Sequence, residues 1–270
     1  MNWFNRAGKA TVLILTLVAV SLTPRANAQG TSTTAPQAKE GSTPDGWHAN
    51  FTPYIWFAGV HGTTGALGHD AQVNAGFGDI FGYLNIGVMG TLEVDHGRVV
   101  MPVDFLWMSL SDNKSLPLND LEAESVHANM KEFIVTPQLG YRIADGKRVK
   151  VDAVFGARIW HLNTSLNLQP TELRLGFSQA ATWTDAVAGG RIKFALSPKA
   201  SVILLGDAGG GGSRQDYQAA GLLGYQISRR WLLLAGYRYL SVNYRPNGGK
   251  QFVYDVNMPG LVLGATFNIK

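Results

Sequence analysis

The sequence contains no cysteine among its 270 residues, which excludes disulfide bonds and thiolate metal sites. Its six histidines lie at positions 48, 61, 69, 96, 127 and 161. None of them has the spacing to a second histidine or to a carboxylate that a metal site requires. The glycine run 209–212 is not followed by the Gly-Lys-Ser/Thr of a phosphate-binding loop. We therefore expect neither a metal nor a cofactor.

An excess of charge of one sign is also lacking. The chain has 23 Lys and Arg residues against 19 Asp and Glu residues. Arg6, Lys9 and Arg25 lie within the first 28 positions, where no acidic residue occurs, so the rest of the chain is close to neutral. A nucleic-acid partner would require a basic face, and we expect no such partner.

Long apolar runs are missing after the first residues. The uncharged run at 10–22 is shorter than the roughly 20 residues of a membrane-spanning helix. It follows two basic residues and precedes Ala26-Asn27-Ala28, a spacing of small residues that predicts a signal peptide over 1–28. The segment 29–46 is rich in Gly, Ser, Thr and Pro and predicts a flexible periplasmic lead-in. Folded structure is expected over 47–270.

From position 47 onward the dominant pattern has a period of two, which indicates β-strands. In the segment 231–240, Trp231, Leu233 and Ala235 share one face of the expected strand, whereas Arg238 lies on the other. The segments 99–109, 132–143, 149–160 and 184–196 repeat this alternation of an uncharged apolar face with a charged face. In a soluble sheet the charged face would meet water, whereas in a membrane barrel it lines the interior.

Two features favour the membrane barrel. The charged face is also rich in small residues, and its charges are few and of mixed sign, so that they can pair across a narrow lumen. We expect the lumen-facing charges to be Glu93, Asp104, Asp152, Arg158, Asp185, Arg191, Asp207 and Arg238, which we call the charge ladder. Aromatic residues near strand ends suit the two membrane interfaces; these are Trp107, Tyr141, Tyr217, Tyr225, Tyr237 and Tyr239.

The alternation predicts an all-β fold, a closed antiparallel up-and-down barrel. Ten strands are expected, at 49–60, 84–95, 98–110, 126–143, 148–162, 180–196, 200–210, 215–228, 230–244 and 251–269. Short turns alternate with longer connections at 61–83, 111–125, 163–179, 209–214 and 245–250, as in barrels with short periplasmic turns and long outer loops. Eight or twelve strands stay open, because 61–83 is long enough for a further hairpin.

Several segments resemble small Gram-negative outer-membrane β-barrel proteins of the porin-like type. They include Val103-Asp104-Phe105, Gly206-Asp207, Gly236-Tyr237-Arg238-Tyr239 and the closing Gly264-Ala-Thr-Phe267. The resemblance covers nearly all of the chain after the signal peptide. It implies residence in the outer membrane, contact with outer-membrane lipid, and handling by the outer-membrane assembly machinery. One departure is the last residue, Lys270, where such barrels commonly end in an aromatic residue. The resemblance implies no reaction.

Three functions stay open. The first is a structural barrel, or one that conducts small polar solutes weakly, with no enzymatic activity. The second is a lipid-modifying outer-membrane enzyme, for which Ser125 with His127 and His161 with Ser165 are the only candidate neighbours at strand ends. The third is a soluble periplasmic barrel that carries an apolar ligand. We expect the first, with the charge ladder plugging the interior, because barrels of about eight to ten strands are mostly filled by side chains.

Overall fold

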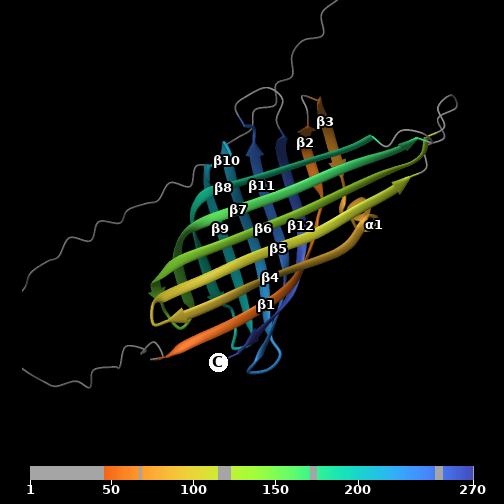
Figure 1. Ribbon diagram of the computed structural model, residues 1–270. Coiled ribbons are helices and arrows are strands. Elements are labelled where there is room, and N and C mark those ends of the chain that lie inside the picture. Colours follow the sequence, from red (N-terminus) through yellow and green to blue (C-terminus); the bar gives the residue numbers. More distant parts are fainter. Residues whose placement is uncertain (1–45, 67–68, 115–122, 171–174, 247–251, 270) are drawn as a thin grey trace, which may run out of the picture. The chain divides into compact units, whose positions relative to one another are not determined.

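Ten antiparallel strands close into a barrel in the computed structural model of the chain (Figure 1), which describes residues 46–66, 69–114, 123–170, 175–246 and 252–269. The predicted signal peptide, nearly all of the lead-in and Lys270 lie outside the described residues. The barrel strands are β1 (Trp47–Ala58), β4 (Leu84–His96), β5 (Val99–Lys114), β6 (Ala123–Asp145), β7 (Val149–Pro170), β8 (Leu175–Ala195), β9 (Ala200–Gly211), β10 (Gln215–Gln226), β11 (Trp231–Tyr244) and β12 (Val253–Asn268).

Closure is achieved by pairing the first strand with the last. The register of β1 with β12 runs from Asn50 opposite Asn268 to Ala58 opposite Gly260. From β4 to β12, each barrel strand pairs with the next one in the chain. Strand β1 pairs with β4, and the segment between these two strands lies outside the closure. The predicted ten-stranded up-and-down barrel is confirmed.

The two ends of the barrel differ. One end, which we call the turn end, carries both ends of the described barrel chain, since Trp47 lies opposite His96 and Asn268 lies opposite Asn50. The short β4–β5 turn lies there, and Gly97 adopts a φ of 58°, a conformation that glycine permits. The opposite end, the loop end, carries the longer connections. In outer-membrane barrels the short turns face the periplasm, so we expect the turn end to face the periplasm.

The long connection 61–83 contains a hairpin, one of the possibilities that the sequence left open. Strand β2 (Val60–Ala66) pairs with β12 and with β3 (His69–Ala75), and both lie outside the barrel closure. The helix α1 (Phe77–Gly82) then leads into β4. No helix in the described part of the chain is long and apolar enough to cross a membrane.

Three predicted outer loops differ from the structure. Strands β5 and β6 extend into the predicted loop 111–125, and β7 and β8 extend into 163–179. The predicted loop 209–214 is a tight connection, because β9 continues to Gly211 and β10 begins at Gln215. The strands are longer than predicted because their pairing continues beyond the apolar belt, as between Asn163 and Ala180. The residues there no longer alternate between apolar and polar, so the sequence pattern does not reveal the strand.

The outward face of the barrel is apolar. Phe155 is 63% exposed, Leu139 60% and Leu233 45%. The opposite, lumen-facing sides of β7 and β11 carry the buried charges Arg158 and Arg238. A continuous band of exposed large apolar side chains is unfavourable in water and requires an apolar surrounding. The face assignment expected from the alternation is therefore the one that the fold has.

Because Leu233 lies between Trp231 at the turn end and Tyr237 on the outward face of β11, it falls inside the apolar belt. We predict that Leu233→Arg lowers the free energy of unfolding from lipid vesicles by about 2–4 kcal/mol, because the charge would have to enter hydrocarbon. Denaturant titration of the refolded barrel measures this quantity.

A matched control is Gln215→Arg, since Gln215 is exposed at the loop-end start of β10, beyond the ring of Tyr217. It should cost between about 0 and 1 kcal/mol. Equal costs for the two variants would show that the face carrying Leu233 does not meet lipid.

Candidate functional site

The interior of the barrel is the candidate site, and it is organised in layers along its axis. At the turn end lies a cavity of about 580 Å³. Its lining combines polar residues such as His48, Glu93 and Arg142 with aliphatic residues such as Ile203 and Leu232. The lining residues are inward because they alternate with the apolar outward residues of the same strands. This cavity is the turn-end vestibule.

The wall of the vestibule carries the first group of ion pairs. Arg191 bridges two acidic residues: it contacts Glu93, and its Nη2 lies 2.7 Å from Asp152 Oδ2. Asp152 in turn accepts a hydrogen bond from Arg142 Nε at 3.0 Å through its other oxygen. Asp152 is 3% exposed, and each of its oxygens accepts from a guanidinium group. A buried carboxylate requires such partners.

The second group lies deeper in the lumen. Arg238 Nη2 donates to Asp104 Oδ2 at 3.0 Å, and Arg238 Nη1 donates to the hydroxyl of Tyr54 at 2.9 Å. The Tyr54 hydroxyl donates to Asp104 Oδ1 at 2.9 Å and so closes a ring of three side chains. Thr91 Oγ1 adds a further bond to Asp104. The Arg238 guanidinium also lies 4.9 Å from the centre of the Trp56 ring, which is within cation–π distance.

The third group is centred on Arg158, which has no exposed surface. Its Nη2 lies 2.8 Å from Asp207 Oδ1, its Nη1 contacts Asp216, and its Nε donates to Thr136 Oγ1 at 3.2 Å. Asp216 also accepts a hydrogen bond from Trp160 Nε1 at 2.8 Å. These groups span β6, β7, β9 and β10, so that Arg158 ties strands on different sides of the lumen together.

The structure brings seven members of the charge ladder into ion pairs; these are Glu93, Asp104, Asp152, Arg158, Arg191, Asp207 and Arg238. The eighth, Asp185, is buried in the lumen but has neutral partners: Trp183 Nε1 at 3.1 Å and the backbone N–H of Ser213 at 2.7 Å. Two charged residues of the network, Arg142 and Asp216, were not among the predicted ladder. Both could have been assigned to the lumen from the alternation along their strands. Asp216 is two residues before Gln218 and Arg142 is four residues after Gln138, and both glutamines line the lumen.

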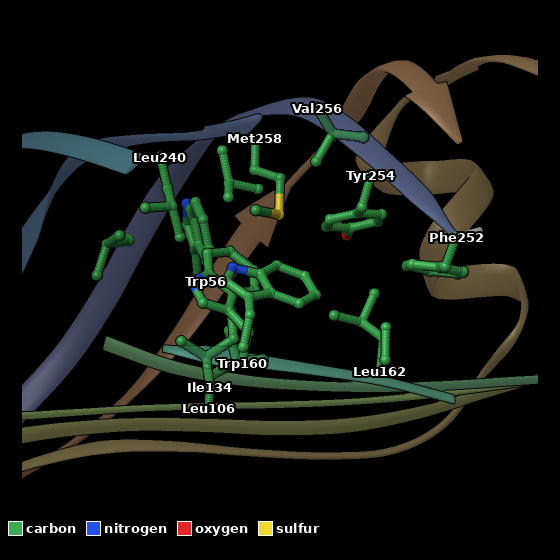
Figure 2. Close-up of a cluster of buried hydrophobic side chains, with 14 residues drawn as sticks. Trp56, Leu106, Ile134, Trp160, Leu162, Leu240, Phe252, Tyr254, Val256 and Met258 are labelled. Atoms are coloured by element: carbon green, nitrogen blue, oxygen red, sulfur yellow. The ribbon is translucent and has the colours of Figure 1, made fainter. Parts of the chain in front are cut away.

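Beyond Arg158 the lumen is filled by apolar and aromatic side chains (Figure 2). The Trp160 and Trp183 rings stack with centroids 5.4 Å apart, and Trp183 stacks on Tyr244 at 4.0 Å. We call the buried members of this layer the apolar plug; they are Trp56, Leu106, Ile134, Trp160, Leu162, Ala181, Trp183, Leu240, Val242, Phe252, Tyr254, Val256, Met258 and Val262. Those on β5, β6, β7, β8 and β11 share a strand face with charges nearer the turn end, as Trp160 follows Arg158 by two positions, whereas the face of β12 carries none.

The aromatic residues expected at the membrane interfaces lie on the outward face. Tyr141 is 52% exposed and Tyr225 is 53% exposed, both near the turn end. Tyr217 and Tyr239 lie nearer the loop end, where their rings stack 6.0 Å apart, whereas Trp107 and Tyr237 lie near the middle of β5 and β11. Their role at the membrane interfaces stays a prediction.

The candidate nucleophile pairs do not form where the structure describes them. His161 and Ser165 are four residues apart on β7, which separates them by about 13 Å along a strand. The His161 ring instead lies 2.7 Å from the hydroxyl of Thr182. The side chains of Ser125 and His127 lie outside the described residues. Among the residues that are described, no three His, Cys, Asp or Glu side chains group as metal ligands would.

Because Arg158 holds two buried carboxylates, we predict that Arg158→Ala is strongly destabilising. Removal of the guanidinium leaves Asp207 and Asp216 charged and poorly hydrated in the lumen, at a cost of about 3–5 kcal/mol in the free energy of unfolding. Urea unfolding of the refolded barrel in lipid vesicles measures the loss.

The matched control is Arg214→Ala, because Arg214 is an exposed arginine in the tight β9–β10 connection. We expect it to change the free energy of unfolding by about 0.5 kcal/mol or less. If both variants cost the same, the buried ion pairs do not stabilise the barrel.

No family profile and no curated protein sequence matches the chain. Among solved structures, it is similar to Ail, the attachment invasion locus protein of Yersinia pestis, with 13% identity, coverage of 83% of this chain and 99% of that chain, and a TM-score of 0.34. It is similar to the translocator domain of the autotransporter NalP from Neisseria meningitidis, with 14% identity, 84% and 90% coverage, and a TM-score of 0.39. It is also similar to Neisserial surface protein A (NspA), with 12% identity, coverage of 82% of this chain and 96% of that chain, and a TM-score of 0.33.

These distant likenesses indicate no activity for this chain, and the assignment rests on the barrel's own geometry. The pairing of β1 with β12 closes the ring of ten strands, and the outward face of the strands is apolar. Only a closed barrel or a helix satisfies its backbone within lipid. The chain therefore forms a closed antiparallel β-barrel whose outward surface is that of a membrane-spanning barrel.

Proposed function

We propose that the protein is a structural outer-membrane barrel that conducts small polar solutes weakly or not at all. The observation that carries the proposal is the apolar plug, with Trp160, Trp183 and Tyr244 stacked across the loop-end half of the lumen. Trp160 has no exposed surface and Trp183 is 5% exposed. Polar solutes cannot cross a layer of packed indole and aliphatic groups without displacing it.

The turn-end vestibule is the part of the lumen that small solutes can enter. The vestibule carries charges of both signs, and many of them form ion pairs with one another, as Arg191 does with Glu93 and Asp152. Small polar solutes therefore enter the vestibule from the periplasm with little selection by charge. They stop at Arg158, beyond which the described lumen side chains are mainly apolar and aromatic, with Glu132 as a buried carboxylate among them.

The other two functions find less support. A soluble carrier of an apolar ligand would bury its aromatic face and expose its charges, whereas Tyr141 and Phe155 point outward and Arg158 points inward. A lipid-modifying enzyme would need a nucleophile beside its base near the interface, and His161 lies beside Thr182. We propose a protein without enzymatic activity, whose partners are outer-membrane lipid and, during insertion, the assembly machinery.

In planar bilayers we predict that the unmodified protein gives no steady conductance. The double variant Trp160→Ala/Trp183→Ala should give a measurable current, because it removes the stacked indoles that fill the outer half of the lumen. Single-channel recording in symmetrical salt measures both proteins.

The control for this experiment is Arg191→Ala, which widens only the vestibule and leaves the apolar plug in place. It should stay silent. A large and steady conductance from the unmodified protein would instead make a dedicated channel the better account.

A further inference from the structure

The turn-end vestibule has two unlike walls. The residues that β1, β4, β6, β7 and β8 contribute to its lining are mainly polar or charged, whereas nearly all of its aliphatic side chains come from β9 to β12. We call these the aliphatic wall; they are Ile203, Leu205, Ala220, Leu222, Leu232, Leu234 and Val262. Ile203, Leu222 and Leu234 keep part of their surface exposed although they face the lumen. Covering such apolar surface with the apolar part of a ligand is favourable.

The strand register places Lys193 at the edge of the aliphatic wall. Lys193 of β8 lies opposite Ile203 of β9, and Ile203 lies opposite Leu222 of β10. Residues that are paired in this way on one face of a sheet have Cβ atoms about 4.5–5.5 Å apart. Leu222 lies opposite Gly236, so that Leu234 is its diagonal neighbour on β11. One ammonium group therefore borders a row of aliphatic side chains.

Lys193 also borders the charged wall, where its neighbour across the sheet is another lysine. Lys150 of β7 lies directly opposite Lys193, and like charges in this position are unfavourable. The Lys150 ammonium lies 3.0 Å from Asp145 Oδ1. In the described part of the chain, no carboxylate forms an ion pair with Lys193. Lys193 is thus a cation without a counter-charge of its own.

The other carboxylates of the charged wall already have partners. Glu93 and Asp152 contact Arg191, and Asp95 Oδ2 lies 3.8 Å from His48 Nδ1. An anion from solution can therefore supply the missing counter-charge of the unpaired lysine without opening any of these pairs.

The vestibule is open to water and has room for a ligand. Lys193 is exposed although its strand position faces the lumen. The side chain of Lys150, at the turn-end start of β7, is 46% exposed. Water therefore reaches both ammonium groups from the turn end. The cavity volume of about 580 Å³ falls within the range of about 300–1,000 Å³ that small-molecule pockets have.

We propose that the vestibule is a binding site for a small amphipathic anion, a carboxylate with a short apolar body. The carboxylate accepts a charge-assisted hydrogen bond from the Lys193 ammonium, and the body lies against Ile203, Leu222 and Leu234. A single unpaired ammonium suits a monoanion, and the aliphatic wall beside it favours an anion with an apolar body over an inorganic one. Such binding goes beyond the proposed function, because an anion held here does not pass the apolar plug, and a barrel without this site would be equally silent in a bilayer.

Fluorine NMR of the folded protein in an uncharged maltoside detergent tests the role of Lys193. The probes are 4-(trifluoromethyl)benzoate and its neutral match, 4-(trifluoromethyl)benzamide. The benzoate should bind saturably and about tenfold more tightly than the benzamide, the value of one charge-assisted hydrogen bond. Lys193→Met should remove this advantage and leave the benzamide unchanged. Lys199→Met is the matched control and should change neither probe, since Lys199 is exposed in the β8–β9 turn at the same end and lies outside the lining.

The aliphatic wall is tested by Ile203→Ser, which removes apolar surface beside Lys193 and should weaken the binding of the benzoate severalfold. Its control is Ile227→Ser, because Ile227 is 55% exposed at the turn end and lies outside the lining. Trifluoroacetate, an anion without a ring, should bind the unmodified protein much more weakly than the benzoate does. Each variant is first required to keep the heat-modifiable gel mobility of a folded barrel.

The proposal is overturned if the benzoate does not bind saturably, or if the benzamide or trifluoroacetate binds as tightly. It is also overturned if Lys193→Met has no more effect than Lys199→Met, or Ile203→Ser no more than Ile227→Ser. Either of the last two results would place the anion on the micelle or elsewhere on the barrel.

Discussion

Backbone N–H and C=O groups find no water inside a bilayer, so the register between β1 and β12 decides whether this chain can reside there. Once Ala58 meets Gly260 and Asn50 meets Asn268, ten strands enclose a narrow lumen. Everything that points inward must then fit and be satisfied within that space. The ion pairs and the apolar plug are both consequences of this closure.

The interior satisfies the constraint differently at its two ends. Toward the turn end, a guanidinium is placed between carboxylates, as Arg158 is between Asp207 and Asp216, because a buried charge without a partner is costly. Toward the loop end, charges give way to indole and aliphatic groups that exclude water by packing. A barrel built in this way has a half with a polar cavity at the turn end and a mainly apolar half at the loop end, and this division is the basis of the structural role that we propose.

Beside α1 the described pairing of β1 with β4 stops at Pro53 opposite Gly90. The six-residue helix α1, with two phenylalanines, packs there against Phe57 of β1. The same helix also lines a small apolar cavity with the buried carboxylate of Glu132 at its lining.

The barrel could be predicted from the sequence because a period of two holds through segments such as 149–160, where Val151 and Phe155 alternate with Asp152 and Arg158. The inward direction of the charges followed from the same parity. The apolar plug could not be predicted in this way, because Trp160 and Leu162 are apolar residues on the charged face, and parity alone does not say where along the axis the lumen changes character. The partners of Asp216 depend on β7 lying across the lumen, which only the closed fold determines.

The division of the lumen can be measured directly, because the chain has no cysteine of its own. Single cysteines would be placed at Ala220 in the vestibule lining, at Leu240 in the apolar plug, and at Gln215 on the exposed start of β10 as a reference. A water-soluble maleimide is then added to the folded protein in detergent, and the labelling rates are compared. We predict that the thiol of Ala220→Cys reacts nearly as fast as that of Gln215→Cys, whereas Leu240→Cys reacts slower by orders of magnitude. Similar rates at Ala220→Cys and Leu240→Cys would show a lumen that is wet throughout and would contradict a closed outer half.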